Sequence, residues 1–308
     1  MAFWDGYWKS LKPLDVEEPI DVWVHRPLAY VLAKLLFPTP VSPNLVTVCS
    51  IVWGIVASLC MVLDFRGHLL AAGASLFMSA VFDCADGQLA RMRGSSSALG
   101  RMLDGAADLV VSTVSVAGGT YLVWQAAHAT PLQGALAVVM CAFTIVTGSF
   151  HTSTYDHYKN VFLRMTHPKY REGEDYEVAL ERYRASAASA SASLPVRLAW
   201  PIYLFYVKRQ RDYVESFDPF TKTRLAHLPP FSEEAARVYR EHAGAPMRVW
   251  RTWFGFGSLV FGMSVSIALG VVHYYMLFRL LLLNAIFYGY LRKRQRRASQ
   301  AAFSALGY

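Results

Sequence analysis

Four aspartates are the most chemically distinctive feature of this sequence. Asp83 and Asp86 are three positions apart, and Asp104 and Asp108 are four positions apart. On a helix with 3.6 residues per turn, each spacing places the two carboxylates on one face. Strongly apolar runs precede and follow the aspartates, and an aspartate at membrane depth costs roughly 2.5–3.5 kcal/mol. A cluster retained at that cost indicates a functional role.

The residues around the two aspartate pairs indicate how the pairs meet and what they bind. Gly94 and residues 95–97 (Ser-Ser-Ser) interrupt the helical pattern, so we expect a tight turn between two antiparallel helices. Converging carboxylates need cations, and ligands that are all oxygen favour Mg²⁺, Mn²⁺ or Ca²⁺ over Zn²⁺. Gly87 and Ala90 leave room for a ligand or a neighbouring helix. The guanidinium of Arg91 suits a phosphate group.

The order and spacing of these residues resemble the signature of the CDP-alcohol phosphotransferase (CDP-alcohol phosphatidyltransferase) family. The pattern is Asp-x2-Asp-Gly-x2-Ala-Arg-x8-Gly-x3-Asp-x3-Asp. It occurs here without departure, at Asp83, Asp86, Gly87, Ala90, Arg91, Gly100, Asp104 and Asp108. Eight fixed positions at fixed spacing seldom arise by chance, so we favour the resemblance over ordinary membrane helices with stray aspartates.

The resemblance implies a reaction and a site. The family transfers a substituted phosphate from a CDP-linked alcohol to a hydroxyl, releases CMP, and uses two divalent ions, Mg²⁺ or Mn²⁺. By resemblance, Asp83, Asp86 and Asp104 hold one ion. Asp83, Asp104 and Asp108 hold the other, and Asp108 is also the general base. The residues expected to bind the nucleotide and the donor phosphates are Gly87, Ala90, Arg91, Ser97, Gly100, Asn44 and Thr47. The sequence indicates no acceptor-binding residue.

Residues 42–47 (Ser-Pro-Asn-Leu-Val-Thr) carry two compatible interpretations. They resemble the family's Pro-Asn-x-x-Thr entry to its first membrane helix, which lies beside the nucleotide in that family. Asn44 could instead simply cap the helix that it begins, because asparagine is a favoured helix cap.

The composition is that of a membrane protein. The chain has 308 residues, of which 54% are hydrophobic and 17% charged, and its mean hydropathy is +0.27. These values exclude an ordinary soluble domain, and the length excludes a large multidomain protein. The formal net charge is +8, which we attribute to basic cytoplasmic loops and membrane phospholipids as partners rather than to nucleic acid.

The hydropathy pattern predicts an all-α integral membrane protein. We expect a six-transmembrane-helix bundle with N-terminal interfacial amphipathic helices and a cytoplasmic insertion between the fourth and fifth spans. The predicted spans are 44–63, 68–92, 99–125, 131–152, 249–270 and 275–293. The corresponding domains are 1–40 (interfacial), 41–152 (first four spans with the motif), 153–248 (insertion) and 249–308 (last two spans and a basic tail).

Lysine and arginine positions predict the orientation. The loops 64–67, 126–130 and 271–274 hold only Arg66, whereas the segments at the other helix ends are basic. Both termini and the aspartate turn should therefore face the cytoplasm. Within the insertion, residues 175–185 read as helical and 185–193 as a flexible linker. We expect the insertion to lie on the membrane surface and to shape access of the acceptor.

Several functions remain open. The favoured one transfers a substituted phosphate from a CDP-alcohol, with CDP-diacylglycerol preferred, to a small polar alcohol such as inositol phosphate, glycerol phosphate or serine, in phospholipid biosynthesis. A second possibility is a soluble CDP-alcohol donor (choline, ethanolamine or inositol type) with a lipid acceptor. A divalent-cation transporter is an alternative from another class, although the aspartates gather at one helix end. We also expect a homodimer.

Overall fold

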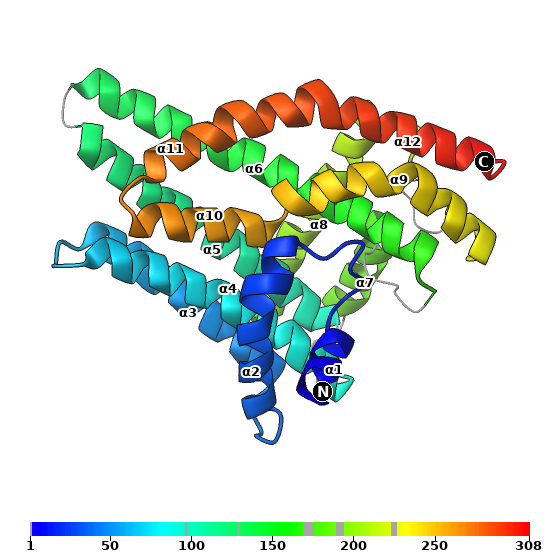
Figure 1. Ribbon diagram of the computed structural model, residues 1–308, viewed down its shortest axis with the longest axis horizontal. Coiled ribbons are helices and arrows are strands. Elements are labelled where there is room, and N and C mark those ends of the chain that lie inside the picture. The colour runs from blue at the N-terminus through cyan, green and yellow to red at the C-terminus, as the bar shows by residue number, and fades with distance from the viewer. Residues whose placement is uncertain (1, 96–97, 128–129, 169–174, 189–193, 223–226) are drawn as a thin grey trace. The chain divides into compact units, whose positions relative to one another are not determined.

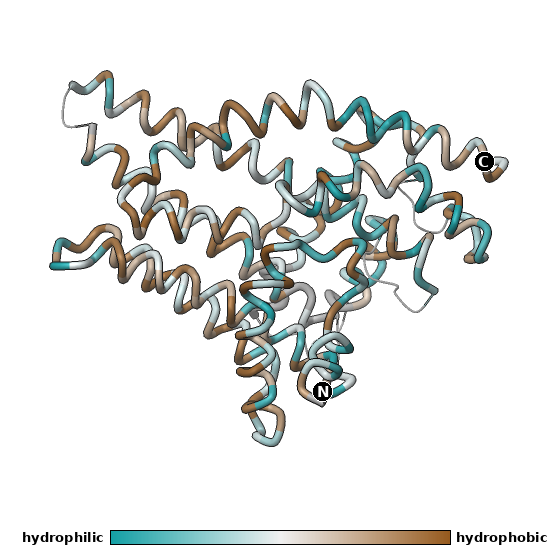
Figure 2. The backbone as a smooth tube through the Cα atoms, viewed as in Figure 1, coloured by the Kyte–Doolittle hydropathy of each residue, from teal (hydrophilic) through white to brown (hydrophobic). Residues whose placement is uncertain are grey.

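All regular elements in the described part of the chain are helices, which confirms the predicted all-α class (Figure 1). The computed structural model describes residues 2–95, 98–127, 130–168, 175–188, 194–222 and 227–308. Within these residues, five helices are long and apolar enough to cross a membrane, so the chain is a multi-pass membrane protein. They are Pro43–Val62, His68–Arg93, Leu103–Ala126, Pro131–Thr166 and Val272–Ala305. Figure 2 shows hydrophobic residues along α3 and α4 and hydrophilic ones along α12.

The chain divides into two compact units. The first comprises Met1–Ser149 and Gly255–Asn284, and the second comprises Phe150–Phe254 and Ala285–Tyr308. The first unit contains the aspartate motif.

Helix α4 is the central helix of the first unit, because it lies against α2, α3 and α10. A Cβ atom at Gly73 would come within 2.5 Å of the Ser264 carbonyl oxygen, so only glycine permits the close approach of α4 to α10. The elements of this unit are α1 (Ala2–Ser10), η1 (Asp21–His25), α2 (Arg26–Leu36), α3 (Pro43–Val62), α4 (His68–Arg93), α5 (Ala98–Ala127), the first part of α6 (Pro131–Thr166), α10 (Phe256–Ala268), α11 (Val272–Leu277) and η3 (Phe278–Leu283).

Local interactions at the helix ends hold α3 beside the end of α4. The Ser42 hydroxyl caps α3 by accepting the Leu45 amide at 3.2 Å. Gly94 ends α4 with a φ of +63°, as its position in the sequence predicted. The Arg93 guanidinium donates to the carbonyl oxygens of Leu36 at 2.7 Å and Thr39 at 2.8 Å. These bonds fasten the loop that enters α3 to the last turn of α4.

The predicted span 249–270 is divided in the structure, so the count of six spans is not confirmed. Helix α9 (Glu233–Trp253) ends before Gly255, and α10 then runs for only 13 residues. The Glu18 carboxylate accepts the amides of Gly257 at 3.2 Å and Ser258 at 2.8 Å, within the first turn of α10. The local hydropathy of residues 249–270 cannot reveal a cap that comes from a residue so distant in sequence. The hydropathy pattern therefore predicted one continuous helix there.

The second unit shows that most of segment 153–248 is helical and packs on the C-terminal helix. Asp218 is buried and accepts hydrogen bonds from the Tyr158 hydroxyl at 2.8 Å and the Ser299 hydroxyl at 2.6 Å. The Trp250 indole donates to the Gln295 side chain at 2.9 Å. The elements are the second part of α6, α7 (Tyr176–Ala188), α8 (Leu194–Phe217), α9, η4 (Ala285–Leu291) and α12 (Arg292–Ala305).

The predicted flexible linker at 185–193 is wrong for its first four residues, since α7 continues through Ala188. Alanine is the strongest helix former and outweighs the intervening serine. Residues 189–193 lie outside the described part of the chain.

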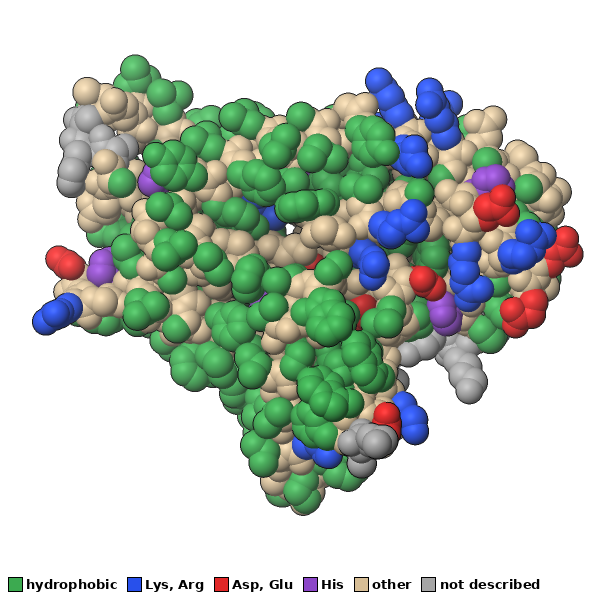
Figure 3. All heavy atoms as spheres, in the orientation of Figure 1, with side chains coloured by type: hydrophobic (Ala, Val, Ile, Leu, Met, Phe, Trp, Pro, Cys, Tyr) green, Lys and Arg blue, Asp and Glu red, His purple; other side chains and the backbone are tan. Residues whose placement is uncertain are grey.

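The N-terminal segment contains the helices α1 and α2. Tyr7 of α1 is buried, whereas Phe3, Trp4 and Trp8 are exposed. Figure 3 shows hydrophobic side chains gathered over α2 and α3. Aromatic side chains exposed in this way suit a membrane interface, and the interfacial position of α1 and α2 stays a prediction.

Candidate active site

The fold brings three of the four motif aspartates together. Asp83 and Asp86 come from α4 and Asp104 from α5, and one carboxylate oxygen of each lies within 4.8 Å of the others. Asp86 is buried, Asp83 half-buried and Asp104 exposed. Asp108 lies one helical turn beyond Asp104, and its charge acts on Asp83 together with those of Asp104 and Asp86. The four carboxylates therefore share one region, near the C-terminal end of α4 and the N-terminal end of α5. These are the helix ends that are predicted to face the cytoplasm.

The donor atoms of this group fit a hard divalent cation. All are carboxylate oxygens, which suit Mg²⁺ or Mn²⁺ better than Zn²⁺. Their mutual repulsion in a partly buried position also calls for positive charge. Asp83, Asp86 and Asp104 can each supply one carboxylate oxygen to a bound cation. Because the group is partly exposed, a substrate could reach that cation.

Thr47 extends the aspartate site onto α3. Its hydroxyl donates a hydrogen bond to the Asp86 carboxylate. The two helices are further joined by the Ser79 hydroxyl, which donates to the Ser50 carbonyl at 2.7 Å. Asn44 lies three residues earlier, in the first turn of α3. Ser42 is the residue that caps this helix, so the alternative interpretation of Asn44 as the cap is wrong.

Gly87 and Arg91 form a second part of the site. A Cβ atom at Gly87 would lie 3.3 Å from Nη1 of Arg91. The absence of a side chain at Gly87 therefore leaves the space that the guanidinium occupies. The Arg91 Nε atom donates to the Ser10 carbonyl at 2.7 Å. The side chain is thus held between α4 and the end of α1.

The remaining predicted residues lie along the same stretch. Ala90 is half-buried on α4, and Gly100 lies in the first turn of α5. Ser97 lies outside the described residues. The nucleotide-binding roles of all these residues stay predictions.

Sequence reasoning missed two supports of the site. Ser10 also accepts a hydrogen bond from Gln88 through its hydroxyl, at 2.9 Å. Arg26 is half-buried, pairs with Glu17 at 2.9 Å, and interacts electrostatically with Asp83. Although burial acts to lower its pKa, Glu17 and other nearby acidic groups raise the pKa of Arg26 overall, so it stays cationic. No local pattern marks either residue, because each reaches the site from more than 50 positions away.

A second group of potential ligands has a different character. Asp21, His25 and Cys84 place one ligand atom each within 4.8 Å of one another, and all three residues are buried. The Asp21 carboxylate is hydrogen-bonded to Nδ1 of His25 at 2.8 Å. This group mixes oxygen, nitrogen and sulfur, so it differs from the all-oxygen aspartate site in the chemistry that it offers.

Comparison with known proteins agrees with the motif. A family model described as CDP-alcohol phosphatidyltransferase matches residues 40–165. A phosphatidylinositol phosphate synthase of Mycobacteroides abscessus is 34% identical over 119 residues, which cover 38% of this chain and 52% of the relative. A protein of the same name from Corynebacterium glutamicum is 34% identical over 79 residues, covering 26% of this chain and 35% of the relative. The chain thus spans about half or less of the length of these relatives. Residues 40–165, which contain the whole aspartate motif, are thus similar to the CDP-alcohol phosphatidyltransferase family, the family that the motif resembles.

Proposed function

We propose that this chain transfers a substituted phosphate from a CDP-alcohol to the hydroxyl of an acceptor alcohol, with release of CMP, in phospholipid biosynthesis. The donor in this proposal is CDP-diacylglycerol, and the acceptor is a small polar alcohol. Inositol phosphate is the first candidate, because both relatives are named phosphatidylinositol phosphate synthase. The observation that carries the proposal is the convergence of Asp83, Asp86 and Asp104, with the charge of Arg91 acting on Asp86.

The proposal assigns a role to each part of the site. Asp83, Asp86 and Asp104 would hold one divalent ion, and Asp83, Asp104 and Asp108 the other. Two such ions supply charge stabilisation for the attacking and leaving oxygens of a phosphoryl group. Arg91, placed by Gly87 and Ser10, binds phosphate oxygens of the donor through its planar fork. Thr47 keeps the Asp86 carboxylate oriented through its hydrogen bond.

Asp108 is the proposed general base. The acceptor oxygen forms a bond to the phosphorus that carries the lipid, and the bond from that phosphorus to the bridging oxygen of CMP breaks. The acceptor hydroxyl gives its proton to the Asp108 carboxylate, and CMP leaves with the electron pair. Half-burial of Asp108, one turn beyond Asp104, supports this role because the acceptor can approach from that side.

The proposal also includes an orientation and an assembly. Both termini, the aspartate site and segment 153–248 face the cytoplasm, and the protein is a homodimer. The distribution of lysine and arginine along the chain supports the orientation.

CMP release by the purified, reconstituted protein tests the function. We expect CMP from CDP-diacylglycerol only when Mg²⁺ or Mn²⁺ and an acceptor are present, and the acceptor panel would contain inositol phosphate, glycerol phosphate and serine. Release from CDP-choline with diacylglycerol instead would establish the soluble-donor alternative. Metal uptake into vesicles without CMP release from any donor would overturn the transferase and favour transport. Full turnover in excess chelator would disprove the two-ion mechanism.

A further inference from the structure

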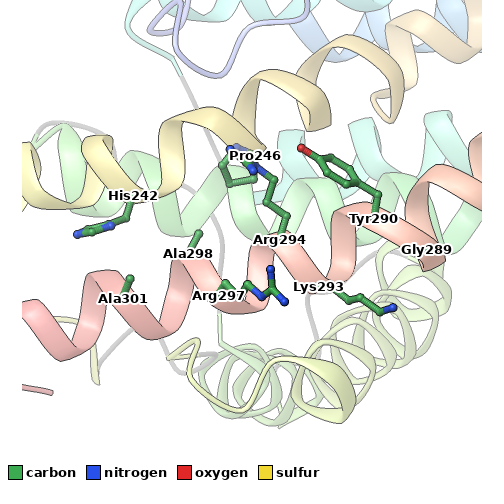
Figure 4. A pocket seen from close by; sticks show the side chains of 9 residues that line it. All are labelled: His242, Pro246, Gly289, Tyr290, Lys293, Arg294, Arg297, Ala298 and Ala301. Atoms are coloured by element: carbon green, nitrogen blue, oxygen red, sulfur yellow. The ribbon is translucent and has the colours of Figure 1, made fainter.

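A basic pocket lies in the second unit, between α9 and the stretch formed by η4 and α12. Its volume is about 360 Å³, within the range of roughly 300–1,000 Å³ that is usual for small-molecule sites. Figure 4 shows Tyr290 and Arg294 extending toward α9, where His242 and Pro246 lie. The lining residues are His242, Pro246, Gly289, Tyr290, Lys293, Arg294, Arg297, Ala298 and Ala301.

The pocket carries cationic groups without an acidic one. Lys293, Arg294 and Arg297 are exposed, and none of the nine lining residues is aspartate or glutamate. In the described part of the chain, no carboxylate forms an ion pair with these three side chains. Arginine forks and a lysine ammonium are suited to phosphate oxygens, which supply the negative charge that the pocket lacks.

Two arginines of the basic run 292–297 pack on aromatic rings that do not line the pocket. Arg292 lies over the Phe217 ring at 4.5 Å, and Arg296 lies over the Phe220 ring at 5.6 Å. Arg294 lies over Tyr290, with 5.9 Å between its guanidinium carbon and the ring centre, which orients it at the pocket. The cations that line the pocket are therefore not explained by the packing of α12. Figure 3 shows basic side chains gathered over α12 and α9.

The position of the pocket points to a lipid as the source of the phosphate. The candidate membrane span Val272–Ala305 supplies seven of the nine lining residues of the pocket. Its sequence from Leu280 to Leu291 is apolar apart from Asn284 and becomes basic directly afterwards. Tyr288 and Tyr290 are exposed at this transition, where tyrosine typically marks the boundary between hydrocarbon and headgroups. A phospholipid beside this helix would hold its phosphate at the level of the basic residues.

We propose that this pocket binds the phosphate headgroup of an anionic membrane phospholipid. Arg294 and Arg297 contact the phosphate oxygens, Lys293 adds charge at the rim, and the Tyr290 hydroxyl donates to the headgroup. The small residues Gly289, Ala298 and Ala301 leave the space that the headgroup fills. This inference does not depend on the proposed transferase activity.

Binding of short-chain lipids to the full-length, detergent-purified protein tests the inference. The probes are dioctanoyl phosphatidylglycerol, dioctanoyl phosphatidylcholine and inorganic phosphate at matched ionic strength, with dissociation constants from calorimetry. In the triple variant Lys293→Gln, Arg294→Gln and Arg297→Gln, we expect at least about a tenfold weaker affinity for phosphatidylglycerol, since charge-assisted contacts are lost. Arg294→Lys keeps the charge but not the fork and should give an intermediate affinity.

A matched triple variant separates the pocket from general electrostatic attraction. Arg184→Gln, Lys208→Gln and Arg248→Gln remove the same charge from exposed positions of the second unit that do not line the pocket. Its affinity should stay within about twofold of the unmodified protein. An equal loss in both triples would overturn the pocket, and so would phosphatidylcholine binding as tightly as phosphatidylglycerol. Inorganic phosphate that binds as tightly as the lipid would overturn the lipid assignment. Unchanged thermal unfolding of each variant without lipid shows that its fold is intact.

Discussion

Carboxylates confined to one small region repel each other, so the aspartates of α4 and α5 need positive charge. At the residue scale, the charges of Asp108, Asp104 and Asp86 all act on Asp83. The protein supplies Arg91 and the half-buried Arg26 nearby, and these two positive charges do not balance the four carboxylates. In the proposed function, divalent cations provide the remaining positive charge. The roles of the individual aspartates can then be distinguished by measuring metal binding and turnover separately.

Asparagine substitutions should divide the aspartates by role. Asp83→Asn and Asp104→Asn remove a ligand from both proposed ions, so Mn²⁺ affinity and CMP release should fall together. Asp108→Asn should lower turnover by about 10²–10⁴-fold, the usual contribution of a general base, and should affect donor binding less. Mn²⁺ binding followed by electron paramagnetic resonance, together with CMP release, measures both quantities. Asp64→Asn, at an exposed position beyond the far end of α3, is the control. A near-normal rate for Asp108→Asn would refute its role as base.

The place of the Arg91 guanidinium depends on the missing side chain of Gly87. Gly87→Ala puts a methyl group 3.3 Å from Nη1 of Arg91, so the guanidinium must shift from its position beside Ser10. We expect a higher KM for the CDP-donor with little loss of thermal stability, because alanine favours the helix by about 1 kcal/mol over glycine.

The matched control is Gly244→Ala, also in a helix, where the nearest atom to the added Cβ is a guanidinium nitrogen of Arg248 at 4.0 Å. This variant should keep the normal KM. Equal KM values for Gly87→Ala and the unmodified protein would show that Arg91 does not position the donor.

At the scale of elements, the sequence predicted helices wherever their ends are encoded locally. Gly94 marked the end of α4. The start of α9 is likewise local, since the Ser232 side chain accepts the Ala235 amide at 3.0 Å. The break before α10 could not be predicted, because Glu18 caps that helix from 239 residues away in sequence. The support of Arg91 by Ser10 was hidden for the same reason, since tertiary contacts leave no periodic pattern.

The Glu18 cap should make stability depend on pH. Burial, followed by the negative charge of Asp21, raises the pKa of Glu18 to about 8 from an ordinary value of 4.5, although Ser258 and Gly257 donate hydrogen bonds to it. The folded chain therefore holds this proton more tightly than the unfolded chain. The resulting stabilisation is fully present below the ordinary pKa of 4.5 and is lost as pH rises through about 8.

Thermal unfolding of Glu18→Gln tests this dependence, because glutamine stays neutral and keeps an acceptor oxygen. The unfolding midpoint of the unmodified protein, relative to Glu18→Gln, should fall between about pH 5 and about pH 8.5. The exposed Glu181→Gln should show no such trend. A relative midpoint that rises with pH would mean that the helix amides hold Glu18 ionised.

For the molecule as a whole, hydropathy predicted where the helices lie along the chain, but it did not predict which helices pack together. The first four spans are found within one or two residues of their predicted starts, because long apolar runs have few alternatives. The association of segment 153–248 with α12 was not foreseen, since it depends on Asp218 meeting Tyr158 and Ser299 in space. The domain boundaries drawn from the sequence stay predictions.

The number of membrane crossings determines where the C-terminal tail lies. The structure has five candidate spans, and five crossings would put the N-terminus and the tail on opposite sides. Six crossings, with α10 as the additional one, would put both in the cytoplasm. The tail holds five lysine or arginine residues between 292 and 297, and basic segments strongly favour the cytoplasmic side. We therefore expect six crossings although α10 is short.

Single-cysteine labelling decides between the two arrangements. In a background with Cys49 and Cys60 replaced by alanine, cysteines at the exposed positions Ser95, Leu269 and Ser304 would be treated with an impermeant maleimide in right-side-out vesicles. Six crossings predict labelling at Leu269→Cys only, because Ser95 and Ser304 then face the cytoplasm. Opening the vesicles should label all three and shows that each is reactive. Labelling of Ser304→Cys but not Leu269→Cys in sealed vesicles would establish five crossings, remove α10 from the membrane, and place the basic pocket of α12 on the outer leaflet.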